Sequence, residues 1–156
     1  MRLVYRIALA KHARDLSGKG ARLTGGRWNA KDTAIIYASE SRSLAAMELL
    51  VHVSLTDIPE EIKIVSIGIP DTSIPNQINP SHLPKDWRKN PAPFSLADIG
   101  TKWVFSMESL LLRVPSAVMM HEFNILINPM HPDMKSVNIV EEETFIYDER
   151  LHKHIK

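Results

Sequence analysis

The 156-residue sequence contains no cysteine. Disulfide bonds, a thiolate nucleophile and cysteine-ligated zinc or iron–sulfur clusters are therefore excluded. The chain also lacks long hydrophobic runs: apolar stretches such as 125–127 are far shorter than the about 20 residues that cross a bilayer. Residues 1–15 have neither the apolar core nor the small-residue cleavage site of a signal peptide. These absences predict a cytoplasmic protein with no contact with the membrane.

The composition is that of a soluble globular chain, with 44% hydrophobic and 24% charged residues. The net charge is only +1, but residues 1–31 carry eight basic side chains against one acid, Asp15, and the tail from Glu141 is acidic. A basic amino-terminal third favours an anionic ligand, either nucleic acid or a phosphorylated small molecule. For any single one of these charges, a solvated surface position explains it equally well.

Alternation and β-branched residues predict more strands than helices. Strands are expected over residues 3–9, 34–38, 62–69, 110–114, 123–127, 136–140 and 144–147. Helices are expected over 41–53, with Ser39 or Ser41 as the N-cap, and over 96–106, with Ser95 as the N-cap and Ile99, Trp103 and Phe105 facing inward. The order is not a regular β-α-β alternation. It predicts an α+β fold, a single domain over 1–156 with a mixed β-sheet and few helices.

Two stretches interrupt these elements. Residues 59–93 hold seven of the ten prolines, which predicts a long surface excursion with only short pieces of structure. Residues 18–26 hold four of the six glycines and are followed directly by Arg27 and Trp28. Glycines allow a close approach of the backbone to a ligand, and an arginine fork suits phosphate. The alternative, a flexible surface turn, is disfavoured by the large Trp28, and the P-loop pattern is absent.

Among single residues, Glu48 lies in an apolar helical segment, with Leu44 and Val51 on the same face. A carboxylate there is costly unless it is paired or lies at a cleft; a partly exposed position at the edge of the helix is equally compatible. Ser116 has no glycine elbow, so a buried structural serine is the simplest interpretation. The seven histidines show no ligand spacing, and we expect no metal site.

Taken in order, several short motifs resemble the RES-domain family, and the resemblance covers about residues 3–151. The motifs are Tyr5-Arg6-Ile7, Gly25-Gly26-Arg27-Trp28-Asn29, Tyr37-Ala38-Ser39, Ala45-Ala46-Met47-Glu48, Val114-Pro115-Ser116, Glu122-Phe123-Asn124, Asn128-Pro129-Met130-His131-Pro132 and Tyr147-Asp148-Glu149-Arg150-Leu151. No single motif is specific, but the ordered set is.

The resemblance implies a toxin of a bacterial type II toxin–antitoxin system that consumes NAD. It implies a fold similar to that of the ADP-ribosyltransferase toxins, and an Xre-type helix-turn-helix antitoxin as partner. NAD is then the substrate, with no tightly bound cofactor. Family members hydrolyse NAD, cleave it with phosphate or transfer ADP-ribose to a protein, so the acceptor stays open among water, phosphate and a target protein.

The same resemblance implies the residues of the site. Arg27, Tyr37 and Glu48 correspond to catalytic residues, and Arg6, Ser116 and Asn124 to substrate-binding positions. Cleavage of the nicotinamide–ribose bond generates a cation at the ribose, which a fixed carboxylate such as Glu48 stabilises. One departure is that Lys31-Asp32 stands where many members have a glycine.

Three functions therefore compete. The first is NAD cleavage by a glycohydrolase or phosphorylase, with mono-ADP-ribosylation of a protein as its variant. The second is a nucleic-acid-binding or RNA-cleaving module, whose affinity would fall steeply with salt; no pair of acid and base residues supports it, and we expect no direct contact with nucleic acid. The third is a non-enzymatic partner protein, for which replacing Glu48 would change nothing in the cell.

Overall fold

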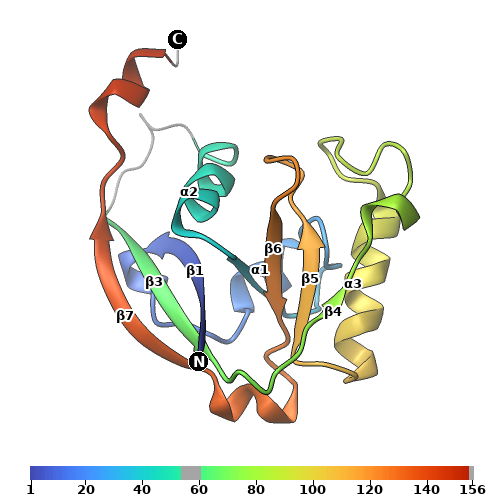
Figure 1. The fold of residues 1–156 in the computed structure, drawn as a ribbon. Coiled ribbons are helices and arrows are strands. Elements are labelled where there is room, and N and C mark those ends of the chain that lie inside the picture. Colours follow the sequence, from blue (N-terminus) through green and yellow to red (C-terminus); the bar gives the residue numbers. More distant parts are fainter. Residues whose placement is uncertain (54–60, 155–156) are drawn as a thin grey trace.

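The computed structural model describes residues 1–53 and 61–154 and shows one α+β domain, as the sequence predicts (Figure 1). Its strands are β1 (Arg2–Leu9), β2 (Ile36–Ser39), β3 (Ile62–Ile69), β4 (Asn76–Gln77), β5 (Leu111–Pro115), β6 (Phe123–Ile127) and β7 (Asn138–Phe145). Its α-helices are α1 (Lys19–Thr24), α2 (Arg42–Leu50) and α3 (Phe94–Ser106). No helix in the described ranges is long and apolar enough to span a bilayer.

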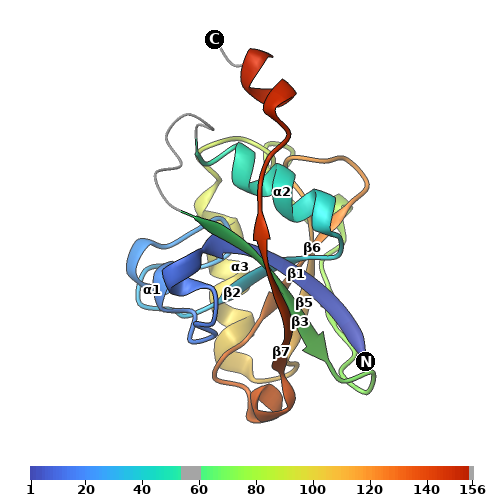
Figure 2. The same ribbon diagram turned by 90° about the vertical axis from the view of Figure 1, so that its left-hand side faces the viewer.

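The seven strands form one mixed sheet in the order β4-β5-β6-β2-β1-β3-β7. Only the β4–β5 pair is parallel. The sheet has two halves, since β1 pairs with β3 along its whole length, whereas β1 and β2 share the single register pair Tyr5–Ser39. Helix α2 follows β2 directly and contacts both β1 and β2, so it lies over this junction (Figure 2).

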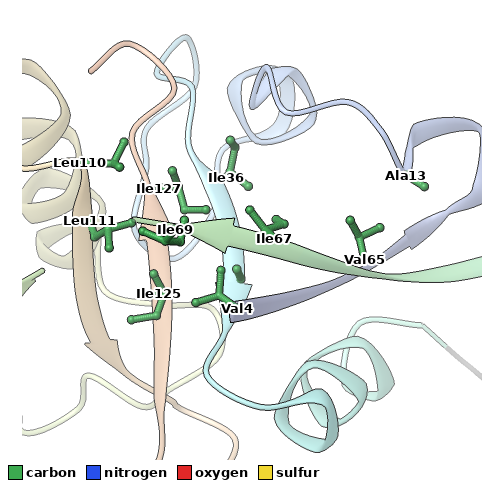
Figure 3. Close-up of a cluster of buried hydrophobic side chains, with 11 residues drawn as sticks. Val4, Ala13, Ile36, Val65, Ile67, Ile69, Leu110, Leu111, Ile125 and Ile127 are labelled. Atoms are coloured by element: carbon green, nitrogen blue, oxygen red, sulfur yellow. The ribbon is translucent and has the colours of Figure 1, made fainter. Parts of the chain in front are cut away.

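One hydrophobic cluster joins the two halves of the sheet (Figure 3). It includes Val4 and Ile67 from β1 and β3, and Ile36 and Ile125 from β2 and β6. A second cluster contains Leu126, the neighbour of Ile125 in β6, together with residues of α3. Because successive side chains of a strand point to opposite faces, β5 and β6 are covered on both faces.

Trp28 belongs to the second cluster and fixes the glycine-containing loop, residues 25–35 between α1 and β2, to α3. A Cβ atom at Gly100 would lie 1.7 Å from the carbonyl oxygen of Trp28, so only glycine allows this approach. The tryptophan therefore serves as the anchor of the loop, which is not a free surface turn.

Several local predictions need correction. The glycine-rich segment contains helix α1, and one continuous strand, β7, replaces the two predicted over 136–140 and 144–147. Ser41 caps α2 by accepting a hydrogen bond from the Leu44 N–H at 3.1 Å, whereas Ser39 belongs to β2. Helix α2 ends at Leu50, short of the predicted residue 53.

Helix α3 also differs from the prediction at both ends. It begins at Phe94 with Pro93 as the N-cap, so Ser95 already lies inside the first turn and cannot cap it. Its buried face contains Leu96, Gly100, Trp103 and Val104. Phe105 lies outside that face and is 62% exposed, which makes its predicted inward orientation wrong.

The proline-rich excursion is confirmed from Pro70 to Pro93, where the regular structure is limited to β4 and a short 3-10 helix, Pro80–His82. The predicted range 59–93 also includes Pro59 and Glu60, which lie outside the described residues, and strand β3, which the sequence predicts with the correct bounds.

Candidate active site

A cleft of about 1340 Å³ opens where the glycine-containing loop, α2, the sheet junction and the proline-rich excursion meet. It is lined by five of the six predicted site residues: Arg6, Arg27, Tyr37, Glu48 and Asn124. The sixth, Ser116, is buried and contacts Glu48 instead of lining the cleft. The fold therefore gathers residues that are up to 118 positions apart in the chain, as the distance from Arg6 to Asn124 shows.

Glu48 is half-buried on α2, and its carboxylate has two hydrogen-bond donors. The Oε1 atom accepts from the Ser116 hydroxyl at 2.7 Å and from the Asn124 side-chain amide at 2.6 Å. These bonds compensate the loss of water around the charge. They also fix the orientation of the carboxylate from two directions, since Ser116 follows β5 and Asn124 belongs to β6.

The Ser116 hydroxyl is itself held by the backbone. Its Oγ accepts hydrogen bonds from the N–H groups of Val118 at 3.1 Å and Met119 at 3.0 Å. A serine hydroxyl has one proton and two acceptor positions. Because both acceptor positions are occupied, the proton is directed at Glu48.

Arg27 links the glycine-containing loop to the proline-rich excursion. Its guanidinium donates hydrogen bonds to the carbonyl oxygens of Trp87 at 2.7 Å and Lys89 at 3.1 Å. Burial lowers the pKa of Arg27, while the negative charge of Glu48 and the Tyr37 hydroxyl act in the opposite direction. Arg27 is thus electrostatically coupled to Glu48 across the cleft.

Tyr37 lines the cleft, and its hydroxyl holds the loop. The hydroxyl donates to Asn29 Oδ1 at 2.6 Å and accepts from the Trp28 N–H at 3.0 Å. Burial raises the pKa of Tyr37, so the hydroxyl keeps its proton at neutral pH. Asn29, whose role no pattern in the sequence indicates, donates to the carbonyl oxygens of Ala21 and Thr33 and thereby closes the loop.

Arg6 lines the cleft, but its guanidinium is directed at the backbone. It donates to the carbonyl oxygens of His12 at 2.7 Å, Ala13 at 3.3 Å and Asp15 at 2.9 Å. Burial lowers the pKa of Arg6, and the nearby Asp15 carboxylate opposes this effect. These contacts hold the turn after β1, and a contact between Arg6 and substrate stays a prediction.

Other residues of the cleft wall were not identified from the sequence. Lys31, Arg88 and Phe94 line the cleft, and Phe94 is 91% exposed. The proline content predicts the excursion that carries Arg88, but no local pattern marks its side chain as part of the cleft. The departure at Lys31-Asp32 has a simple explanation: Asp32 has a φ of 74°, a conformation that glycine favours and aspartate tolerates.

In the described part of the chain, no group of three or more histidine, aspartate or glutamate side chains is arranged to hold a metal ion. The chemical groups of the cleft are instead a fixed carboxylate, arginine cations and aromatic rings. Such a set suits an anionic ligand that develops positive charge at one carbon atom during reaction.

The RES domain family model matches residues 3–148, and the chain belongs to the RES domain family. The "Prs ADP-ribosylating toxin" of Sphingobium sp. is 40% identical over 141 residues, covering 89% of this chain and 88% of the relative. The "Toxin Res" of Yersinia enterocolitica is 39% identical over 151 residues, covering 96% of this chain and 99% of the relative. The predicted membership of a toxin family is confirmed.

Among solved structures, the crystal structure of the M. tuberculosis MbcT-MbcA toxin–antitoxin complex contains a similar chain. The TM-score is 0.73, and the match covers 99% of this chain and 88% of that chain. At 17% sequence identity this similarity concerns the fold alone. It confirms the predicted α+β architecture.

Proposed function

We propose that this protein is the toxin of a toxin–antitoxin system and that it cleaves NAD at the bond between nicotinamide and ribose. Membership of the RES domain family supports the first part. The single observation that carries the second is the carboxylate of Glu48, fixed through one oxygen by Ser116 and Asn124 at a cleft that also contains Arg27.

In the proposed reaction, the bond from the ribose C1′ atom to the nicotinamide nitrogen breaks. Its electron pair leaves with nicotinamide, which becomes neutral, so no strong general acid is needed. Positive charge develops on the ribose, and the negative charge of Glu48 stabilises it. An acceptor then attacks C1′ through an oxygen or nitrogen atom and loses its proton.

The other residues bind and orient NAD. Arg27 and the loop backbone contact the pyrophosphate or ribose oxygens, and the Tyr37 ring stacks on the flat nicotinamide cation. Ser116 acts on the carboxylate, because its single proton is already directed at Glu48. Asn124 lies at the cleft and is available both to Glu48 and to substrate.

Two acceptor classes are open. Water or phosphate would make the protein an NAD glycohydrolase or phosphorylase. A protein acceptor is the second candidate, and the name of the Sphingobium relative, which describes ADP-ribosylation of Prs, favours it.

Product analysis distinguishes the acceptors. Purified protein is incubated with NAD alone, with added phosphate, and with purified Prs from Sphingobium, and the products are identified by mass. Free ADP-ribose indicates water, its 1″-phosphate indicates phosphate, and Prs carrying ADP-ribose indicates protein modification. Intact NAD in all three mixtures would contradict the proposed function.

The cellular proposal has a separate test. Expression of the protein alone should arrest bacterial growth while NAD falls, and co-expression of an Xre-type helix-turn-helix antitoxin encoded beside it should prevent both effects. Growth arrest at normal NAD levels would remove the glycohydrolase and phosphorylase activities and leave protein modification.

A further inference from the structure

We propose that Ser39 is a positioning residue of this site and that it orients Glu48 through the side-chain amide of Asn124. The Ser39 hydroxyl donates to Asn124 Oδ1 at 2.7 Å, and Asn124 Nδ2 donates to Glu48 Oε1 at 2.6 Å. The three side chains form one chain of hydrogen bonds. The catalytic part of this inference rests on the proposed function.

The role of Ser39 follows from the two-sided chemistry of the asparagine amide. One end of the amide donates and the other accepts, so a rotation by half a turn exchanges them. If Asn124 turned its oxygen toward Glu48, two acceptors would face each other, one of them charged. The Ser39 hydroxyl stabilises the productive orientation because it supplies a proton to the oxygen end.

The backbone holds Ser39 at this position. Ser39 is 4% exposed and lies directly opposite Asn124 in the register of β2 and β6. It is also the residue of β2 that pairs with Tyr5 of β1, where the two halves of the sheet meet. Its alternative role as a helix N-cap is taken by Ser41.

The consequence is an asymmetric carboxylate. Both donors to Glu48, Ser116 and Asn124, reach the Oε1 atom. Among the described residues, Oε2 has no hydrogen-bond or ion-pair partner. The network therefore leaves one oxygen of Glu48 for the ribose, and Ser39 contributes to the direction in which that oxygen points.

The test compares Ser39→Ala with a matched control, Ser66→Ala. Ser66 is also a buried serine and pairs with Tyr5 from the other side, through β3. For Ser39→Ala we expect kcat for nicotinamide release to fall about tenfold, because small displacements of a catalytic group have effects of this size or larger. KM should stay close to that of the parent, and Tm should fall modestly because the Asn124 oxygen loses its donor. Ser39→Thr, which keeps the hydroxyl, should recover most of the rate. Ser66→Ala should keep the parental kcat.

A double variant tests whether Ser39 acts through Asn124. Ser39→Ala should add no further loss to Asn124→Ala, since the intermediate group is already gone. The inference would be overturned if the two losses of kcat multiplied in the double variant, or if Ser39→Ala kept the parental kcat.

A structural readout separates this inference from the proposed function. In the ¹H–¹⁵N spectrum, the Asn124 side-chain NH₂ protons should exchange slowly with water in the parent and in Ser66→Ala, and fast in Ser39→Ala. An identical Asn124 signal in all three proteins would overturn the positioning role, whatever the reaction. Absence of nicotinamide release by the parent protein would overturn the proposed function alone.

Discussion

The Nη1 atom of Arg27 donates a 2.7 Å hydrogen bond to the carbonyl oxygen of Trp87, 60 residues away. The neighbouring Nη2 atom binds the carbonyl oxygen of Lys89. Both the loop that contains Arg27 and the excursion that contains Arg88 line the cleft. Arg27 therefore joins two walls of the proposed active site, beside its proposed role in binding NAD.

Replacing Arg27 with lysine keeps the positive charge but removes the fork that reaches both carbonyl oxygens. We expect a higher KM for NAD, a large loss of kcat/KM, and a decrease of about 1–3 kcal/mol in the free energy of unfolding from the lost charge-assisted bonds. Trypsin should also cut faster after Lys85 and Lys89. Kinetics, denaturant unfolding and timed digestion of Arg27→Lys measure these effects. Arg22→Lys, at an exposed position of α1 outside the cleft, is the control for stability. Unchanged kinetics in Arg27→Lys would assign phosphate recognition to other groups.

Gly100→Ala tests the anchoring of the loop on α3. The added Cβ atom would lie 1.7 Å from the Trp28 carbonyl oxygen, so the helix or the loop must shift. We expect destabilisation of about 3 kcal/mol or more, at the upper end for overpacking. The control is Gly20→Ala in α1, where nothing lies within 4 Å of the added atom and alanine favours the helix. Equal Tm values for the two variants would contradict this packing.

Most strands and the Ser41 cap of α2 follow from local patterns, and β3 is predicted with its observed bounds. Predictions fail where contacts between distant parts of the chain determine the local structure. Helix α1 forms in a glycine-containing segment because Asn29 holds the Ala21 carbonyl and Trp28 packs on α3. Whether Phe105 is exposed depends on which face of α3 packs against the sheet. The apolar character of Phe105 alone does not indicate that face.

In the site, too, the sequence indicates some residues but not the contacts between distant segments. The resemblance in ordered motifs indicates Arg27, Tyr37 and Glu48, and the structure brings them to one cleft. It does not indicate how Ser116 reaches Glu48, because that contact requires the end of β5 to approach α2. Phe94 was missed for the same reason: its position at the cleft depends on the path of the excursion before α3.

Tyr37→Phe separates the hydroxyl from the ring. The variant leaves Asn29 Oδ1 and the Trp28 N–H without their partner, so we expect a loss of about 1–3 kcal/mol in the free energy of unfolding at neutral pH. The ring remains available for stacking. The decrease in kcat/KM should therefore be small compared with that of Tyr37→Ala, as measured by nicotinamide release.

The difference in stability between the parent and Tyr37→Phe should depend on pH. Burial raises the pKa of Tyr37 above its ordinary value of 10.0. The unfolded chain then loses this proton at a lower pH than the folded protein. The contribution of the Tyr37 hydroxyl to the free energy of unfolding is therefore fully present below about pH 10 and is lost as the pH rises further. Denaturant midpoints measured from about pH 8 to about pH 11 should converge for the parent and Tyr37→Phe. A constant difference would contradict the burial of this hydroxyl.

Phe94→Ala tests the outer part of the cleft. Phe94 lines the cleft and is 91% exposed, so its ring is free to stack on the adenine of NAD. Stacking of a base on an aromatic side chain contributes about 1–3 kcal/mol, which predicts a KM for NAD raised roughly fivefold or more, with kcat and Tm nearly unchanged. Phe105→Ala, on the same helix but away from the cleft, is the control. Equal KM values for both variants would exclude this contact.

Nicotinamide release by Glu48→Gln is the most direct test of the central claim that the Glu48 carboxylate stabilises a ribosyl cation formed from NAD. Glutamine keeps an oxygen for Ser116 and Asn124 but removes the negative charge, so Tm should stay the same or rise slightly. We predict that kcat falls by roughly 10²–10³-fold while NAD affinity changes little, with the exposed Glu108→Gln as an unaffected control. A folded Glu48→Gln protein that releases nicotinamide at the parental rate would contradict the mechanism.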